Sequence, residues 1–385
     1  MDLAGHKIRT GHVVLGPAVR HIKVKRDDLG QCLLPARFIL VRHSVETLES
    51  EESDKLLKIP VSADLFDQFA VGLRLAFKDL RHKSRVFELT KALDPEQWLL
   101  SGQESCYLAA GTVCELLDTD DTKLAEFEIS DFAGLPAKIT LFQGDHLLLT
   151  TLSQAGMPAS IDKDGQIIRP AQIGCTLESA ISRLNVGDPV WIDDGKLGAE
   201  VETILESGAL LRVTRARSKG VDIKPDKGIN FPETDLGLPS LSEKDLQDLS
   251  FACSHADLIG FSFVESLADM ENLIQELARR GATDLPIIAK IETNRAVKNL
   301  PDIVLGTLGR HSLGIMIARG DLAVELGSAR LAEVQEELLW LCEAAHVPVI
   351  WATQVLESIA KKGTRSRPEF TDAAMAVRAE CVMLN

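Results

Sequence analysis

The chain lacks several patterns that would place it in well-defined classes of protein. Its seven cysteines are an odd number and form no CxxC pair, so neither a disulfide framework nor a zinc site is expected. No apolar run approaches the roughly 18 residues of a membrane helix. The first residues contain no apolar stretch of the kind that a signal peptide requires. These absences predict a soluble cytoplasmic protein in which most of the cysteines are buried thiols.

The familiar phosphate-binding loops are also missing. The sequence contains neither GxxxxGK[ST] nor GxGxxG after a predicted strand, and it lacks the HRD and DFG motifs of protein kinases. It has 42 Lys and Arg against 57 Asp and Glu, a net charge of −15, without the basic surplus that nucleic-acid binders usually show. We therefore expect no nucleic-acid and no membrane partner. An anionic substrate would need a few well-placed cations and a metal ion.

The C-terminal part of the chain, residues 232–385, repeats a pattern of apolar strand, polar loop and amphipathic helix. Ser242–Asp245 reads as a capping box that opens one of the helices. Near-continuous apolar strands indicate burial on both faces, as in a parallel sheet, and they are predicted at 257–263, 286–292, 314–319, 348–353 and 381–384. The alternation predicts an α/β fold, either a (β/α) barrel or a doubly wound sheet.

Residues 12–231 read as a mixed, β-rich domain inserted into the first. Short alternating strands with turn signals such as Asp193–Lys196 are predicted between residues 174 and 214. Further strands are predicted at 137–142 and 146–151. Two segments, 62–84 and 94–117, are predicted to be partly helical.

Polar residues stand at or just after the C-terminal ends of three predicted strands, where active-site residues gather in a (β/α) barrel. They are Lys290 with Glu292, Arg319-Gly320-Asp321, and Thr353-Gln354. Glu292 and Asp321 could together hold one divalent cation. Lys290 could place positive charge beside a transferring phosphoryl group or an enolate oxygen. Taken singly, each has a plain structural explanation, such as a helix cap for an Asp after Gly; their occurrence on successive strands favours a functional site.

Several longer motifs, in the same order along the chain, resemble those of pyruvate kinases. The motifs are Met1–Gly11, Ala289–Glu292, Ile315–Leu322 and Pro348–Ser358, with Asp194-Gly195 and Lys227-Gly228 at matching places. The resemblance implies a TIM-type (β/α)8 barrel with a β-rich lid inserted after its third strand. The barrel domain would comprise residues 1–11 and 232–385, and the lid residues 12–231.

The resemblance also implies a reaction and its cofactors. The phosphoryl group of phosphoenolpyruvate would pass to ADP, giving pyruvate and ATP, a step of glycolysis. Glu292 and Asp321 would bind Mg²⁺ or Mn²⁺, Lys290 would stabilise the phosphoryl group and the enolate, and Thr353 would assist protonation through water. Asp2 and Ser262 would contribute to a K⁺ site.

The resemblance implies that four further residues bind the substrate or the nucleotide. Arg9 would help to bind the phosphates of ADP, Lys227 would lie in the nucleotide cleft, and Arg319 and Gly320 would contact substrate. The sequence leaves the oligomeric state open, a homo-oligomer included, and it names no effector.

The sequence departs from the family in several ways. Family members have two barrel strands before the segment that matches Met1, and they continue beyond Asn385 into a final helix and a regulatory domain. We therefore expect Met1 to be an internal methionine of a longer protein. His6 stands where Pro is expected, and Glu265 where a basic residue is expected. The lid spans about 220 residues, roughly double the family's.

Two other functions remain compatible with the sequence. One is a metal-dependent oxo-acid lyase on the same barrel, and the other is a degenerate barrel that binds a ligand without catalysis. Lys290 and Lys227 favour phosphoryl transfer to a nucleotide over the lyase. The intact set of Lys290, Glu292, Asp321 and Thr353 weighs against degeneracy.

Overall fold

The computed structural model describes residues 1–42, 56–130, 132, 134–364 and 366–384. The chain divides into two compact units. One comprises Met1–Val13 together with Lys138–Asn385, and the other comprises Val14–Ala137. The segment predicted as lid therefore contributes to both: its first part forms the second unit, and its remainder belongs to the same unit as the barrel segments.

A six-stranded parallel sheet forms the centre of the first unit. Its strands, in spatial order, are β1 (Asp2–Leu3), β23 (Ile259–Phe261), β24 (Ile287–Ile291), β25 (Leu313–Ala318), β26 (Val349–Ala352) and β27 (Cys381–Val382). Every neighbouring pair is parallel. All six residues of β25 are buried, which is why the strand reads as a continuous apolar run. The predicted strands of this part are confirmed.

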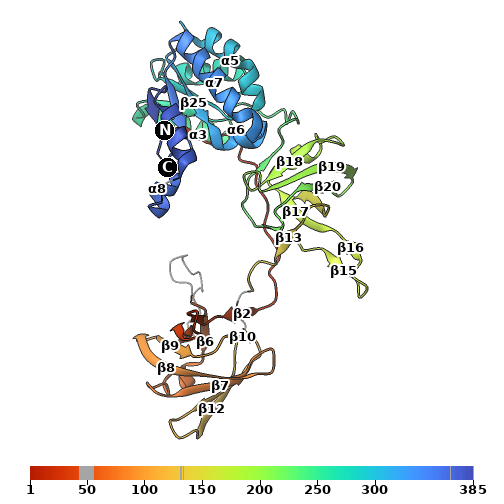
Figure 1. Ribbon diagram of the computed structural model, residues 1–385, viewed down its shortest axis with the longest axis vertical. Coiled ribbons are helices and arrows are strands. Elements are labelled where there is room, and N and C mark those ends of the chain that lie inside the picture. Colours follow the sequence, from red (N-terminus) through yellow and green to blue (C-terminus); the bar gives the residue numbers. More distant parts are fainter. Residues whose placement is uncertain (43–55, 131, 133, 365, 385) are drawn as a thin grey trace. The chain divides into compact units, whose positions relative to one another are not determined.

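Helices follow the strands of this sheet. They are α3 (Glu243–His255), α4 (Leu267–Arg279), α5 (Asn294–Thr307), α6 (Arg319–Leu326), α7 (Ser328–Ala345), α8 (Glu357–Lys362) and α9 (Arg367–Ala376). The predicted capping box is present, since Ser242 accepts a hydrogen bond from the backbone of Asp245 and returns one. Figure 1 shows α5, α6 and α7 packed around β25. The arrangement is an incomplete (β/α) barrel, and the predicted fold class is confirmed.

The rest of the first unit is a β-rich segment. Its six-stranded sheet has the order β17 (Ala171–Cys175), β14 (His146–Thr151), β20 (Gly208–Arg215), β19 (Leu197–Leu205), β18 (Pro189–Ile192) and β22 (Ile229–Asn230). Two small ribbons and one helix accompany it, namely β13 (Ile139–Leu141) with β21 (Val221–Ile223), β15 (Ser160–Ile161) with β16 (Ile167–Arg169), and α2 (Glu178–Ile181). The predicted turn after β18 is present, with left-handed φ at Asp193, Asp194 and Gly195.

The second unit is built on a seven-stranded sheet with its own core. The order is β12 (Lys123–Glu128), β11 (Val113–Leu117), β7 (Arg74–Lys78), β8 (Ser84–Asp94), β9 (Gln97–Gly102), β5 (Ala36–Arg42) and β6 (Lys58–Val61). Additional elements are the pair β10 (Cys106–Ala109) with β2 (Val19–Ile22), the pair β3 (Lys25–Arg26) with β4 (Cys32–Leu34), and α1 (Ala63–Phe66). Phe38, Phe87 and Leu100 are among the side chains buried in its core.

The prediction of partly helical structure at 94–117 is wrong. That segment forms β9, β10 and β11, and the helix found within 62–84 is the single turn α1. The burial pattern of the neighbouring β8 alternates between exposed and buried residues along its first half, which is the period of a strand rather than of a helix. The short strands are separated by residues 103–105 and 110–112, so each run offered too few residues for that period to stand out.

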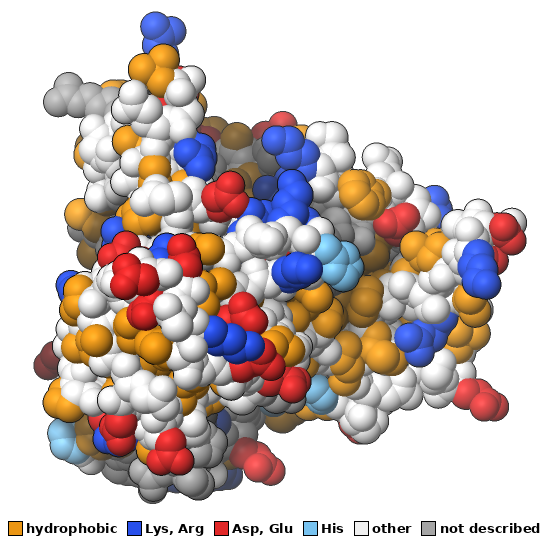
Figure 2. Space-filling model, turned by 90° about the horizontal axis from the view of Figure 1, so that it is seen from below, with side chains coloured by type: hydrophobic (Ala, Val, Ile, Leu, Met, Phe, Trp, Pro, Cys, Tyr) orange, Lys and Arg blue, Asp and Glu red, His pale blue; other side chains and the backbone are white. Residues whose placement is uncertain are grey.

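The charged surface is mixed in sign. Figure 2 shows acidic and basic side chains interspersed over the face it presents, with hydrophobic side chains between them. On this face, individual sites can therefore differ in sign from the net negative charge of the chain. Among the described residues, no helix is both long enough and apolar enough to cross a membrane.

Candidate active site

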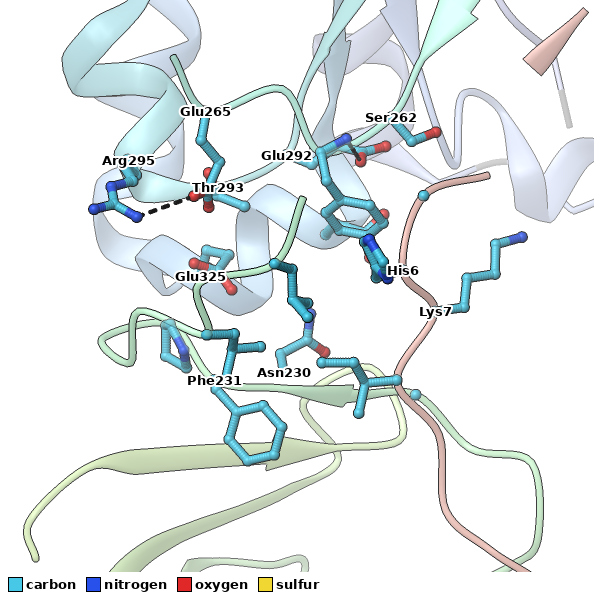
Figure 3. Close-up of a pocket in the computed structure, with 18 of the residues that line it drawn as sticks. His6, Lys7, Asn230, Phe231, Ser262, Glu265, Glu292, Thr293, Arg295 and Glu325 are labelled. Atoms are coloured by element: carbon cyan, nitrogen blue, oxygen red, sulfur yellow. Dashed lines mark hydrogen bonds and ion pairs between the residues drawn. The ribbon is translucent and has the colours of Figure 1, made fainter. Parts of the chain in front are cut away.

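A large pocket lies in the first unit, at the C-terminal ends of β23 and β24. Its lining comes from three places in the sequence: the N-terminal segment Asp2–Arg9, the β-rich segment from Asp193 to Phe231, and the loops that follow the barrel strands. Figure 3 shows Ser262 and Glu292 on the barrel side of this pocket and Asn230 and Phe231 on the side of β22. The N-terminal segment with His6 and Lys7 runs between the two sides. Because parallel strands end at the same edge of a sheet, residues distant in sequence meet here.

Lys290, near the end of β24, is the centre of a polar network. Its Nζ lies 2.9 Å from Ser262 Oγ and 3.2 Å from a carboxylate oxygen of Asp2. It is also 3.3 Å from Glu292 Oε1. Burial alone would lower the pKa of this lysine, but the charges of Glu292 and Asp2 outweigh burial and raise it. The site therefore holds a fixed ammonium charge at neutral pH.

Glu292 follows β24 and is buried, with an exposed fraction of 3%. Its Oε2 accepts a hydrogen bond from the backbone N–H of Phe263 at 2.8 Å. Burial raises the pKa of Glu292 to about 7, and the charge of Asp321 adds to this shift, while Lys290 and the Phe263 N–H oppose it. A carboxyl group with such a pKa is half protonated near neutral pH, so its ionised form lacks a fully compensating partner.

Asp321 lies in the first turn of α6. Burial is the main cause that raises the pKa of Asp321, and the charge of Asp194 adds to it; Lys290 and Lys7 act in the opposite direction. The charge of Asp321 thus disfavours the ionised form of Glu292, which is the electrostatic situation that a bound cation relieves.

The pair fits a divalent metal ion by its donor chemistry. Glu292 and Asp321 supply carboxylate oxygens, which are hard ligands of the kind that Mg²⁺ and Mn²⁺ prefer. Among the described residues no group of three or more His, Cys, Asp or Glu side chains could hold a metal. A two-carboxylate site suits Mg²⁺, which usually keeps waters and takes substrate phosphates as its other ligands.

Asp2 and Ser262 lie together, as the prediction of a K⁺ site requires, but both already contact the ammonium of Lys290. The carboxylate of Asp2 lies over Gly260, where an added Cβ would come within 1.9 Å of its Oδ1. Glycine at this position thus makes room for the carboxylate. The two oxygens are suitable ligands for a monovalent cation but make only part of a coordination shell.

Thr353 and Gly320 form a second cluster beside the first. Gly320 donates its backbone N–H to Thr353 Oγ1 at 2.8 Å, and Gly320 is followed directly by Asp321. Arg319 donates through Nε to the carbonyl of Ala352 at 2.9 Å and also contacts the carbonyl of Thr353. The lining of the pocket includes Asp321 but not Arg319, Gly320 or Thr353.

The two residues predicted near the nucleotide, Arg9 and Lys227, both line the pocket. Arg9 pairs with Asp226 at 2.8 Å, and Lys227 lies 3.4 Å from Asp193. The side chains of Arg9 and Lys227 are 37% and 36% exposed, so both remain accessible to a ligand. Exposed pairs of this kind contribute little to stability.

Sequence reasoning missed several residues of the pocket. Burial raises the pKa of Glu325 to about 7, and the charges of Glu265 and Asp321 add to the shift, against a hydrogen bond from the backbone of Asn294. Glu325 follows Asp321 by four residues, one turn along the same helix, and that spacing was a usable signal. Arg295 bridges Asp235 and Glu265 at 3.1 and 3.3 Å, as Figure 3 shows for Glu265; no pattern in the sequence indicated this contact.

Comparison of the sequence with known proteins shows the family of this chain. The family model described as pyruvate kinase, barrel domain, matches residues 103–385, which is more than half of the chain. The chain belongs to the pyruvate kinase family. The resemblance predicted from the sequence motifs is thereby confirmed.

Individual pyruvate kinases match this chain over part of their length. A pyruvate kinase of Bacillus licheniformis is 35% identical over 224 residues, which cover 58% of this chain and 37% of that protein. One from Mycobacterium intracellulare is 36% identical over 234 residues, covering 58% and 48%. Pyruvate kinase PKLR of Rattus norvegicus is 37% identical over 203 residues, covering 52% and 34%. The alignments thus span between a third and a half of the length of these relatives.

Proposed function

We propose that this chain carries the active site of a pyruvate kinase and transfers the phosphoryl group of phosphoenolpyruvate to ADP. The observation that carries the proposal is the fixed ammonium of Lys290 beside the buried carboxyl group of Glu292, with the half-buried carboxyl group of Asp321 in the same pocket. These groups share one pocket with Arg9 and Lys227. The pocket therefore combines cations for an anionic substrate with oxygen ligands for a metal.

In the proposed reaction, the bond between phosphorus and the enol oxygen breaks while a bond forms to a terminal oxygen of ADP. Lys290 would stabilise the charge on the phosphoryl group and on the enolate oxygen that is left behind, since its ammonium is already oriented and partly desolvated. The enolate carbon then takes a proton, with Thr353 assisting through water. Arg9 and Lys227 would hold the phosphates of ADP.

The proposed cofactors follow from the same residues. Glu292 and Asp321 would hold Mg²⁺ or Mn²⁺, which when bound supplies positive charge to the phosphate oxygens. Asp2 and Ser262 would contribute to K⁺ binding. By its family we propose a cytoplasmic enzyme of glycolysis with phosphoenolpyruvate, ADP and ATP as its ligands.

The proposal is tested by following pyruvate formation from phosphoenolpyruvate with Mg²⁺ and K⁺, with and without ADP. We expect formation that depends on ADP and falls by roughly 10²–10³-fold in Lys290→Ala, the usual cost of removing one stabilising group from a preorganised site. Lys298→Ala is the matched control, because Lys298 is exposed and lines the same pocket. It should keep activity within about threefold.

Each alternative has its own result in this assay. Conversion of oxo-acids without ADP would favour a lyase. Wild-type protein that releases no pyruvate, although it binds Mn²⁺, would identify a degenerate barrel. Equal losses in Lys290→Ala and Lys298→Ala would contradict the role given to Lys290.

A further inference from the structure

The turn that follows β26 has an unusual backbone. Thr353, Gln354 and Leu356 all have positive φ, at 68°, 55° and 53°. Positive φ is uncommon outside glycine, and for a β-branched residue such as threonine it is an outlier. Such a conformation persists when the surrounding structure holds it in place, and it is typical of functional sites.

The guanidinium of Arg319 is the group that holds this turn. Its Nε donates to the carbonyl of Ala352 at 2.9 Å, and its Nη2 donates to the carbonyl of Thr353. In an extended strand, successive carbonyls point to opposite sides of the chain. A left-handed φ at Thr353 brings the two carbonyls to the same side, where two N–H groups of one planar guanidinium can bind both. The contact and the backbone conformation therefore require each other.

Arg319 is itself fixed on its remaining sides. Its Nη1 pairs with the carboxylate of Asp372, which lies on α9. Its guanidinium lies over the ring of Trp351, 4.5 Å from the ring centroid. The Arg319 side chain is only 11% exposed. Lysine has a single charged nitrogen in place of the planar guanidinium, so it cannot make all of these contacts at once.

The held turn determines where the hydroxyl of Thr353 lies. Thr353 Oγ1 accepts the backbone N–H of Gly320 at 2.8 Å. A hydroxyl that accepts this bond keeps its own hydrogen available for another partner. The residue after Gly320 is Asp321, so the hydroxyl is tied to the segment that carries a proposed metal ligand.

We propose that Arg319 is a positioning residue for Thr353. Its guanidinium fixes the left-handed turn after β26, and the turn fixes the hydroxyl against the start of α6. This role differs from the substrate contact that the resemblance implied for Arg319. The inference rests on the proposed function, in which Thr353 assists protonation of the enolate.

The kinetic test replaces the guanidinium of Arg319 with the ammonium group of lysine, which keeps the positive charge. In Arg319→Lys we expect kcat to fall by about 10–100-fold, because small misplacements of catalytic groups have effects of this size. KM for phosphoenolpyruvate should stay within about threefold, since the binding groups are unchanged. Arg378→Lys is the matched control: Arg378 also pairs with a carboxylate, that of Glu336, and it should keep wild-type kcat. A tenfold or larger rise in KM at unchanged kcat would overturn the inference in favour of substrate contact.

A second change tests the turn itself. Gln354→Asn keeps an amide side chain and introduces a residue that adopts left-handed φ more readily. Added to Arg319→Lys, it should restore kcat by about threefold or more, because the turn then needs less support. A role in binding substrate predicts no such recovery, and its absence would count against the inference.

A structural readout separates this inference from the proposed function. In protein labelled at threonine methyl groups, the Thr353 signal is assigned by its loss in Thr353→Ser. It should shift or broaden in Arg319→Lys and stay in place in Arg378→Lys, whether or not the chain turns over substrate. If wild-type protein forms no pyruvate, the proposed function fails while the methyl signal still decides the positioning. An unchanged signal in Arg319→Lys would overturn the inference.

Discussion

The raised pKa of Glu292 predicts a specific pH dependence of metal binding. A carboxylate must be ionised to bind a divalent metal, so protons and metal compete for it. Burial and the charge of Asp321 raise the pKa of Glu292 to about 7. At pH 6 about one molecule in eleven would carry the ionised form, and at pH 8 about ten in eleven, so the affinity for Mn²⁺ should rise by about tenfold over this interval.

The assay titrates the protein with Mn²⁺ and measures the free ion by electron paramagnetic resonance. Glu292→Gln should weaken binding by about 100-fold or more, because it removes a proposed ligand. Glu325→Gln is the matched control, since burial also raises the pKa of Glu325 to about 7 but Glu325 is not a proposed ligand. That variant should keep the tenfold pH dependence. Equal Mn²⁺ affinity at pH 6 and 8 in the wild type, or wild-type affinity in Glu292→Gln, would show that Glu292 does not bind the metal.

Three further predictions concern stability. Gly260→Ala should displace the Asp2 carboxylate, which would lie 1.9 Å from the new Cβ. Because this carboxylate is the end of a flexible side chain that is 59% exposed, the free energy of unfolding in urea should fall by only about 1 kcal/mol or less, and a loss of several kcal/mol would show that the carboxylate is held in place. Gly228→Ala, with open space around its Cβ, should leave the Asp2 carboxylate where it is. Glu325→Gln should stabilise the metal-free protein relative to wild type, by about 1–2 kcal/mol more at pH 8 than at pH 5 after allowance for solvent screening. The reason is that a carboxyl group with a raised pKa contributes stability below its unfolded pKa, and this stability is lost as pH rises through about 7. Equal effects of the substitution at both pH values in thermal melts would contradict this. Asp79→Asn should destabilise the second unit by about 3 kcal/mol in urea at pH 7. Burial alone would raise the pKa of Asp79, but hydrogen bonds from neighbouring backbone and guanidinium groups lower it well below its usual range. The difference in stability from wild type should therefore shrink as pH falls below about 4, and a difference that stays constant into acid would argue against a charged Asp79.

The parallel sheet could be predicted because its strands are buried on both faces. Each then reads as an apolar run of its own, with a helix pattern after it. The meeting of Lys290, Glu292 and Asp321 followed from one rule, since parallel strands present their C-terminal ends at the same edge. Their proximity could therefore be predicted without knowing how their side chains pack.

Other features depend on contacts that no local pattern encodes. Asp2 lies against Gly260 through strand pairing across 258 positions of the sequence, and the left-handed φ of Thr353 is enforced by Arg319 from another strand end. The strands of the second unit were partly misread as helix because each run is short and broken by turns. Sequence patterns thus identified the residues that we propose to react, while the residues that hold them in place required the structure.

The most direct test of the account is to follow the phosphoryl group itself. Phosphorus NMR of a mixture of phosphoenolpyruvate, ADP, Mg²⁺, K⁺ and the protein separates the signals of phosphoenolpyruvate, ATP and inorganic phosphate. We expect the phosphoenolpyruvate signal to decline as the three signals of ATP grow in equal measure, and Lys290→Ala to slow both changes together. Release of inorganic phosphate without ATP, or ATP formation at the same rate in Lys290→Ala, would contradict the assignment of this pocket as a phosphotransferase site.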